Sequence, residues 1–192
     1  MNKIKLFAVI DTISPTIDYQ FEFHKKQDKY LISRGLVVTD LLAAPDIVNA
    51  IEAYNFFNIE PFTLVIADWN SHLKFIELVW DGSQKHVMEL PKEAKIWSSS
   101  TLYSDEMKND RQQWFEQFKS ANELTSVDAK YFHKFTHNHN KEYGVIMDRG
   151  FVKTTSITQV EKIKGEVVLN FENLQENTLS SSTMLFSEAI HD

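Results

Sequence analysis

The sequence predicts an α+β fold built mainly from antiparallel sheets. Three observations lead to this prediction: alternating apolar and polar residues in the first and last parts of the chain, two aromatic helical stripes between them, and tight-turn signals between successive strands. Strands joined by short turns pair in antiparallel order, and consecutive helices must cover a sheet or each other. With 192 residues, of which 43% are hydrophobic, the chain is long enough to bury a core.

The first part of the chain predicts two strands and two short helices. Residues 5–10 are an apolar run that suits a buried strand, and residues 19–23 alternate like a strand with one buried face. Residues 36–41 suggest a short helix. Pro45 opens a second helix that ends near Tyr54, because proline fits the first turn of a helix.

A three-stranded meander follows. Residues 62–67 are apolar on both faces, so this strand is expected to lie between two layers. Asn70 and Ser71 turn the chain into a second strand over residues 73–80. The pair Asp81-Gly82 is a strong tight-turn signal and leads into a third strand over residues 85–90.

Two aromatic helices come next. The first begins at Ser104, with acidic residues in its first turn, and the second is capped by Ser126. The expected buried stripe of the first helix is Met107, Arg111, Trp114, Phe115 and Phe118. The residues of the second helix expected to face inward are Val127, Tyr131, Phe132 and Phe135.

In the last third of the chain, apolar residues again alternate with polar ones, as expected of strands. Strands are predicted over residues 143–147, 151–160 and 167–171. Residues 177–182 contain few apolar side chains and are expected to be mobile. The chain is therefore expected to form one domain over residues 1–175, followed by a C-terminal tail over residues 176–192.

Composition and charge exclude several classes of function. A formal net charge of -7 argues against a surface for nucleic acid or for an anionic membrane. No apolar run is long enough to span a bilayer, so membrane insertion is not expected. The chain has no cysteine, which excludes disulfides, thiolate metal sites and a cysteine nucleophile, and fits a cytoplasmic location.

The clearest candidate site is the run Ile96-Trp97-Ser98-Ser99-Ser100-Thr101-Leu102-Tyr103. It would place several hydroxyl groups at the end of a strand, just before a helix. The alternative is a serine-rich strand exit that leads to a helix cap. Two pairs of carboxylates, Glu77 with Glu89 and Asp68 with Asp81, are weaker candidates, because acidic residues at strand ends are usually solvated.

Three histidines, His133, His137 and His139, include a pair at i, i+4 that suits zinc. No glutamate lies between them in the H-E-x-x-H pattern, and histidine is favoured at a helix end by the dipole alone. The sequence therefore assigns no metal site, no cofactor and no catalytic residue.

Five segments in order resemble the NRDE family, also called transport and Golgi organisation protein 2, and in particular its form in Bacteroidetes-type bacteria. They occupy residues 33–42 (SRGLVVTDLL), 60–65 (EPFTLV), 77–82 (ELVWDG), 96–103 (IWSSSTLY) and 146–154 (IMDRGFVKT). The resemblance covers most of the chain, from about Phe21 to Phe171.

The resemblance implies an N-terminal nucleophile (Ntn) hydrolase-like fold, a four-layer αββα sandwich that serves as an amide-bond hydrolase scaffold. Family members begin Met-Cys, and the freed cysteine would attack with its own α-amine as base. An Asn-Arg-Asp-Glu motif follows on an early strand. This sequence begins Met1-Asn2 and has neither feature. It is therefore expected to be incomplete at its N-terminus and inactive as a hydrolase.

By resemblance, Ser98, Ser99 and Thr101 line the substrate pocket, and Arg34 and Arg149 are the matching arginines. Each arginine could instead be a structural cap or turn residue. The alternative function is a non-enzymatic module that binds or carries a small ligand, since the family is also linked to haem or acyl-lipid handling. A missing strand would leave an open sheet edge, through which the chain is expected to self-associate.

Overall fold

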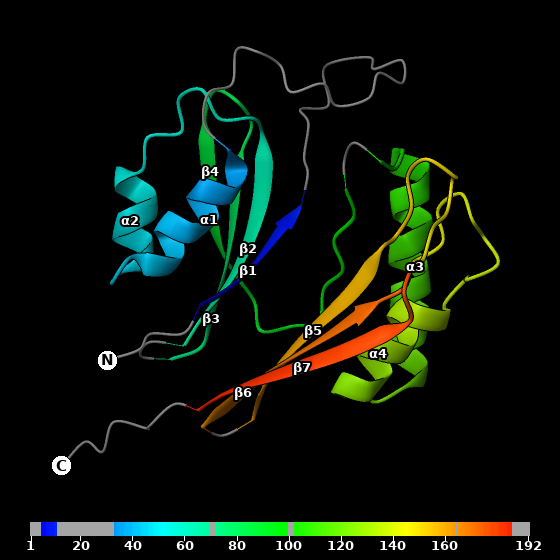
Figure 1. Cartoon of the computed structure of the whole chain (residues 1–192). Coiled ribbons are helices and arrows are strands. Elements are labelled where there is room, and N and C mark those ends of the chain that lie inside the picture. Colours follow the sequence, from blue (N-terminus) through cyan, green and yellow to red (C-terminus); the bar gives the residue numbers. More distant parts are fainter. Residues whose placement is uncertain (1–4, 11–32, 70–71, 100–101, 164, 186–192) are drawn as a thin grey trace. The chain divides into compact units, whose positions relative to one another are not determined.

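The computed structural model describes residues 5–10, 33–69, 72–99, 102–163 and 165–185 of the chain, and only the backbone of residues 5–10 (Figure 1). The chain divides into two compact units, residues 1–104 and residues 105–192. Each unit contains one antiparallel sheet and two helices, so the α+β class is confirmed. The αββα sandwich and the single domain over residues 1–175 stay predictions.

The first unit is built on a four-stranded sheet in the order β1-β2-β3-β4. Its strands are β1 (Lys5–Ile10), β2 (Phe62–Asp68), β3 (Lys74–Trp80) and β4 (Lys85–Leu90), and every neighbouring pair is antiparallel. The predicted strand over residues 5–10 and the predicted meander are therefore confirmed. The predicted strand over residues 19–23 and the predicted turn at Asn70 and Ser71 lie outside the described residues.

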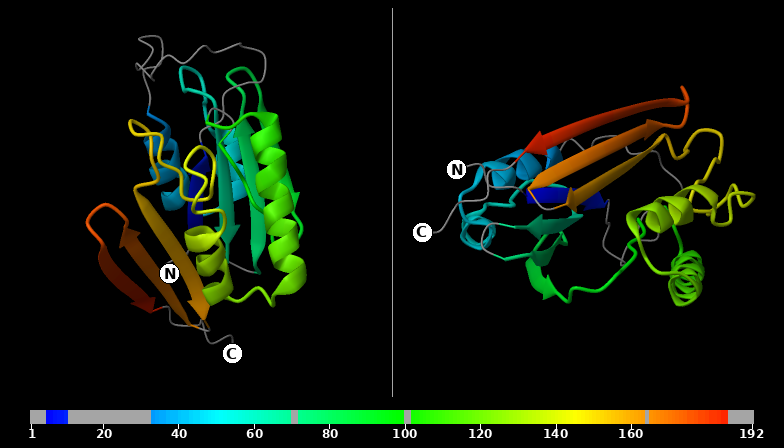
Figure 2. Two further views of the ribbon diagram at one scale, coloured as in Figure 1. Left: turned by 90° about the vertical axis from the view of Figure 1, so that its right-hand side faces the viewer. Right: turned by 90° about the horizontal axis from the view of Figure 1, so that it is seen from below.

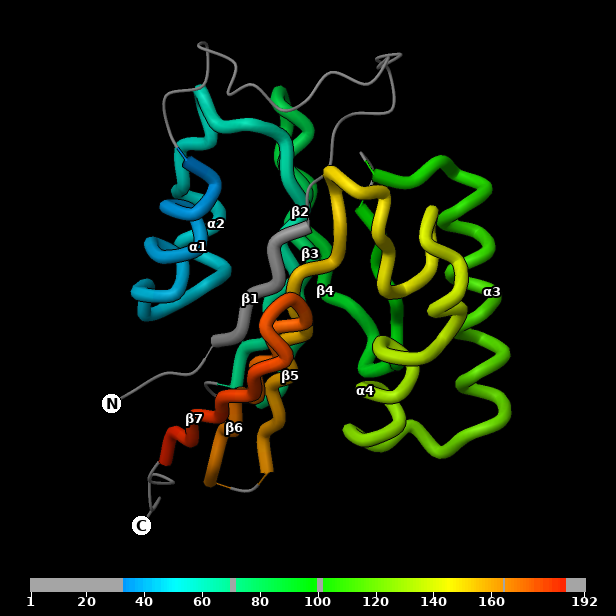
Figure 3. Tube along the Cα trace, turned by 45° about the vertical axis from the view of Figure 1, so that its right-hand side comes forward, coloured from blue at the N-terminus to red at the C-terminus, as the bar shows by residue number. Residues whose placement is uncertain are grey.

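Two short helices, α1 (Arg34–Ala43) and α2 (Ile47–Ala53), cover one face of this sheet (Figures 1 and 3). Ser33 caps α1 by accepting a hydrogen bond from the amide of Gly35, and Asp46 caps α2 by accepting one from Asn49. Helix α2 thus begins after Asp46, two residues later than the proline suggested. The helices and the sheet share one core: Val37, Leu41, Ile47, Ile51, Phe56, Ile59, Phe62, Leu64, Ile66, Ile76, Leu78 and Trp80.

The register of β3 separates two sets of side chains. Ile76, Leu78 and Trp80 belong to the core beneath the helices. Because side chains alternate along a strand, Glu77 points to the opposite face of the sheet. The turn after β3 needs Gly82, whose φ of 96° is a conformation that other residues rarely adopt. The predicted turn at residues 81–82 is therefore confirmed.

The second unit pairs two helices with a three-stranded sheet. The helices are α3 (Asp105–Ala121) and α4 (Ser126–Phe135), and the strands are β5 (Ser156–Ile163), β6 (Glu166–Asn173) and β7 (Thr178–Leu185). The sheet order is β5-β6-β7, with both pairs antiparallel. Figure 2 shows α3 and α4 next to each other, with the long twisted strands of this unit beside them.

Helix α3 packs against α4 through aromatic rings. Phe115 of α3 is buried, and its ring centroid lies 5.3 Å from that of Phe132 on α4. The Phe118 ring lies at the same distance from Phe132. Trp114 is half-buried, and its ring stacks on that of His137 with 3.9 Å between the ring centroids. The predicted inward stripe of α3 is confirmed in part: Arg111 and Phe115 are buried, and Met107, Trp114 and Phe118 are half-buried.

Helix α4 differs from the prediction in two ways. Its N-cap is Thr125, not Ser126, because Thr125 and Asp128 form a reciprocal capping box. Only Phe132 is buried in α4. Val127, Tyr131 and Phe135, which were expected to face inward, are exposed on a stripe with a spacing of four residues.

The C-terminal strands also correct the prediction. Residues 143–147 form a turn and bends instead of a strand. The guanidinium of Arg111 binds the carbonyls of Tyr143 and Gly144 at 3.0 and 2.8 Å, and Asn140 binds the amides of the same two residues. The next strand, β5, begins only at Ser156. The segment expected to be a mobile tail contains β7, whose backbone pairs with β6 although all eight of its residues are exposed. Backbone hydrogen bonds support a strand that buries few side chains.

Candidate functional site

The predicted hydroxyl run lies in the loop that follows β4. Ser98 and Ser99 are half-buried and have no regular secondary structure. The hydroxyl of Ser99 accepts a hydrogen bond from the amide of Leu102 at 3.4 Å. Thr101 lies outside the described residues. The structure thus places two of the three predicted hydroxyl residues in one loop of the first unit.

This loop is attached to the sheet through Trp97 and Glu77. The indole Nε1–H of Trp97 donates a hydrogen bond to Oε1 of Glu77 at 2.6 Å. The ammonium of Lys95 lies 3.5 Å from the same oxygen and 4.9 Å from the centre of the Trp97 ring. The Glu77 side chain is only 16% exposed. Lys95 and Trp97 therefore form, with Glu77, a polar cluster on the sheet face that α1 and α2 do not cover, and Ser98 and Ser99 follow directly in the chain. We call it the Glu77 cluster.

Arg34 is not part of the Glu77 cluster. It is the first residue of α1, and its guanidinium lies 3.5 Å from the carboxylate of Glu60. Helix α1 packs on the face of the sheet that carries Leu78, whereas Glu77 points to the other face. The sheet therefore separates Arg34 from Ser98 and Ser99.

Arg149 belongs to the second unit, where it holds a turn. Its Nε donates to the carbonyl of Glu142 at 2.7 Å and lies 3.2 Å from Oε1 of the same residue. Its amide also bonds to the carbonyl of Val152. These contacts fit the alternative of a structural turn residue. A role for Arg149 in ligand binding stays a prediction.

Neither predicted carboxylate pair is brought together. Glu77 is opposite Met88, and Glu89 is opposite Ile76, so the two glutamates point to opposite faces of the sheet. Asp68 pairs with Lys74 where β3 begins, whereas Asp81 follows the other end of β3.

In the part of the chain that the structure describes, no group of three or more His, Asp or Glu residues could hold a metal ion. The His137 ring instead stacks on Trp114 and lies 5.7 Å from the ring of His139.

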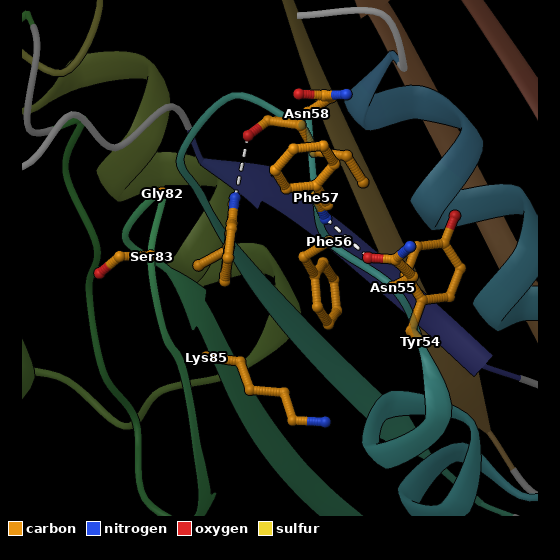
Figure 4. Close-up of a pocket in the computed structure, with 10 residues that line it drawn as sticks. Tyr54, Asn55, Phe56, Phe57, Asn58, Gly82, Ser83 and Lys85 are labelled. Carbon is orange, nitrogen blue, oxygen red and sulfur yellow. Dashed lines mark hydrogen bonds between the residues drawn. The ribbon is translucent and has the colours of Figure 1, made fainter.

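A second feature of the first unit was not predicted. A hollow of about 620 Å³ lies between the connection that follows α2 and the β3–β4 turn (Figure 4). We call it the Phe57 hollow, after the side chain at its rim that is 72% exposed. Its lining residues are Tyr54, Asn55, Phe56, Phe57, Asn58, Ile59, Trp80, Gly82, Ser83 and Lys85. The sequence signal for it was the dense aromatic and amide run over residues 54–58.

Hydrogen bonds hold both walls of the Phe57 hollow. The Tyr54 hydroxyl donates to Asp40 at 2.7 Å; burial and this contact raise the pKa of Tyr54 to about 12, so the phenol stays protonated. On the other wall, the carboxylate of Asp81 accepts from the amides of Gln84 and Ser83, both at 2.7 Å. These bonds, with the contact to His86, hold the pKa of Asp81 well below its usual range.

No family model, curated protein or solved structure matches this chain. The resemblance to the NRDE family therefore stays a prediction. In the described ranges, no helix combines the length and apolar character needed to cross a membrane.

Proposed function

We propose that this chain is an NRDE-family protein with an Ntn-hydrolase-like scaffold, and that it binds a small acyl-amide ligand without cleaving it. The five ordered segments support the family assignment. The mixed helices and antiparallel sheets agree with the coarse fold class of that scaffold. A cytoplasmic location is part of the same proposal, on the basis of the absence of cysteine.

The observation that carries the proposed binding role is the Glu77 cluster. The bond from Trp97 to Glu77 holds the chain immediately before Ser98 and Ser99 against the sheet. Hydroxyl groups donate and accept hydrogen bonds, and a carboxylate accepts them, so together they match both the N–H and the C=O of an amide. Because the chain has no cysteine, it lacks the thiol that would form an acyl intermediate.

Acyl 4-nitroanilides test the chemical part of this proposal. We expect no burst of 4-nitroaniline and no acyl adduct in the intact mass of the purified chain. An acyl adduct mapped to the N-terminal residue would contradict the proposal that the chain binds amides without cleaving them.

Binding is tested separately with N-acetyl-alanine amide, followed by NMR. We expect shifts of the amide signals of residues 96–99, weakened by S98A or S99A. The matched control is S83A, a hydroxyl outside this loop. Equal binding by all three variants contradicts a role for the serines.

A second candidate function, an acyl-lipid or haem carrier, is favoured by one observation in the second unit. Val127, Tyr131 and Phe135 form an exposed apolar stripe on α4. The stripe lines a small groove of about 310 Å³ together with Lys130, Lys134, Gln159 and Glu161. An acyl chain could lie on the stripe, with its carboxylate near Lys130 and Lys134, which both also bind Glu172. Titration with a fluorescent fatty acid and with hemin tests this candidate; Y131S should weaken binding, whereas the exposed control F151S should not.

Self-association through a sheet edge is also part of the proposal. Strand β7 is an edge of its sheet, and Leu179 and Leu185 are about three-quarters exposed (74% and 75%). Antiparallel pairing of two copies about Ser182 would place Leu179 opposite Leu185. We expect a concentration-dependent dimer in sedimentation velocity, abolished by L179K/L185K and retained by F151K. A monomer at high concentration contradicts this pairing.

A further inference from the structure

The Phe57 hollow has an apolar floor and an exposed aromatic rim. The Phe56 side chain is 4% exposed, and its ring stacks on Trp80 with 5.5 Å between centroids. Phe57 follows directly but is 72% exposed, so it contributes little to the core. Figure 4 shows the Phe57 ring above Phe56, on the side of the hollow away from Lys85. Such a ring is available to stack on a planar ligand.

Lys85 supplies the charge of the hollow. Its ammonium donates to the carbonyl of Ile51 at 2.9 Å and to that of Glu52, in the last turn of α2. These two bonds anchor the side chain at the helix end, where a cation is favoured. An ammonium has three hydrogens, so one donor remains. Lys85 forms no ion pair with a carboxylate among the residues that the structure describes.

Amide groups add further donors. The side-chain oxygen of Asn55 accepts from the amide of Phe57 at 3.0 Å, which leaves its NH₂ group for a ligand. Asn58 has a φ of 61°, and the described part of the chain offers its side chain no hydrogen bond. The other polar side chains of the lining already have partners: Ser83 donates to Asp81, Tyr54 donates to Asp40, and the Trp80 Nε1–H donates to the carbonyl of Ile59.

The hollow therefore offers one cation and two amide donors beside an aromatic face, and no carboxylate is among its lining residues. The neighbouring carboxylate of Asp81 accepts from the amides of Ser83 and Gln84 and contacts His86. A volume of about 620 Å³ is in the range of small-molecule sites. We propose that the Phe57 hollow binds a small aromatic carboxylate, with its ring against Phe57 and its carboxylate at the ammonium of Lys85. This site lies on a different part of the first unit from the Glu77 cluster and does not depend on the function proposed for that cluster.

The test uses 2-naphthoate as the probe and the full 192-residue chain. Isothermal titration gives the affinity, and NMR maps the amides that shift. We expect shifts over residues 54–59 and 82–85, and at least tenfold weaker binding of 2-naphthamide, which has the same ring without the charge. Equal affinity for both probes, or shifts confined to other residues, would overturn the proposal.

Variants separate the contribution of the ring from that of the charge. F57S removes an exposed ring and should leave the fold intact while it weakens 2-naphthoate binding about tenfold. F151S removes another exposed ring in the second unit and is the matched control, with unchanged affinity. K85M should abolish the preference for 2-naphthoate over 2-naphthamide, and K85R should keep it. Because K85M also removes a cap of α2, F57S decides the outcome if K85M fails to fold; unchanged binding by F57S contradicts the site.

Discussion

Trp97 and Glu77 are joined by a hydrogen bond of 2.6 Å between the indole Nε1–H and Oε1, across 20 positions of sequence. This bond connects the loop after β4 to the neighbouring strand β3, on the sheet face opposite α1 and α2. It satisfies a carboxylate that is only 16% exposed, so neither group is left without a partner. Ser98 and Ser99 directly follow the residue that makes this contact.

We predict that W97F destabilises the first unit by about 1–3 kcal/mol, because a charge-assisted hydrogen bond to a largely buried carboxylate is lost while most of the ring packing remains. Urea unfolding measures this change. Hydrogen exchange should show faster exchange over residues 96–99. W69F, at another half-buried tryptophan of the same unit, is the control and should leave exchange in this loop unchanged. Slow exchange in W97F would show that the loop is held by other contacts.

The meander could be predicted from sequence because its signals are local. An apolar strand at residues 62–67 and a turn at Asp81-Gly82 determine three strands and their order. Strand β7 could not, because its stability comes from backbone pairing with β6 and not from its own side-chain pattern. The turn and bends over residues 143–147 are bound by Arg111, more than 30 positions earlier in the chain.

Only part of the candidate site could be predicted from local sequence signals. Ser98 and Ser99 were found as a hydroxyl run, but the position of Glu77, which binds the neighbouring Trp97, requires the register of β3, which sets the face that each side chain points to. The separation of Arg34 from Ser98 and Ser99 also depends on the register of β3. The Phe57 hollow forms between two connections, and single-sequence patterns describe helices and strands better than the spaces between loops.

The N-terminus of α4 allows a direct comparison of two neighbouring hydroxyl residues. Thr125 Oγ1 accepts from the amide of Asp128 at 3.2 Å, and the Asp128 carboxylate accepts from the amide of Thr125 at 3.1 Å. T125A should therefore lower the free energy of unfolding by about 1 kcal/mol. S126A should change it by no more than about 0.5 kcal/mol, because the Ser126 hydroxyl has no hydrogen bond among the described residues and only its carbonyl accepts from the Gln159 side chain. A larger effect of S126A in urea unfolding would restore Ser126 as the cap.

Substitution of alanine for three of the glycines should destabilise the chain to different extents. In G144A the new Cβ would lie 2.4 Å from the carbonyl oxygens of Asn140 and His137, so the backbone must move. In G82A the Cβ would lie 3.3 Å from Pro61, at a φ of 96°. In G150A only the φ of 83° opposes the change, because no atom lies within 4 Å. We expect G144A to be the most destabilising, G82A next and G150A least, at about 1 kcal/mol. Thermal unfolding of the three variants checks this order.

Glu172 on β6 makes the second unit sensitive to acid. Its carboxylate accepts a hydrogen bond from Lys134 and lies 3.2 Å from the ammonium of Lys130, so two residues of α4 bind the sheet through one side chain. The hydrogen bond from Lys134 is the largest cause that lowers the pKa of Glu172 below its ordinary value of 4.5. In the unfolded chain the pKa returns to that value, so the unfolded state binds a proton at a higher pH than the folded state.

The sign of the pH effect follows. The stabilisation by Glu172 is fully present above pH 4.5 and is lost as the pH falls through the lowered pKa of the folded state. We expect the free energy of unfolding of the parent chain to exceed that of E172Q by a constant amount between pH 6 and 8, and this difference to shrink steadily between pH 4.5 and 3. E166Q, at an exposed glutamate of the same strand, is the control. A difference between the parent and E172Q that stays constant down to pH 3 in urea unfolding would show that the two lysines do not bind the charged form of Glu172.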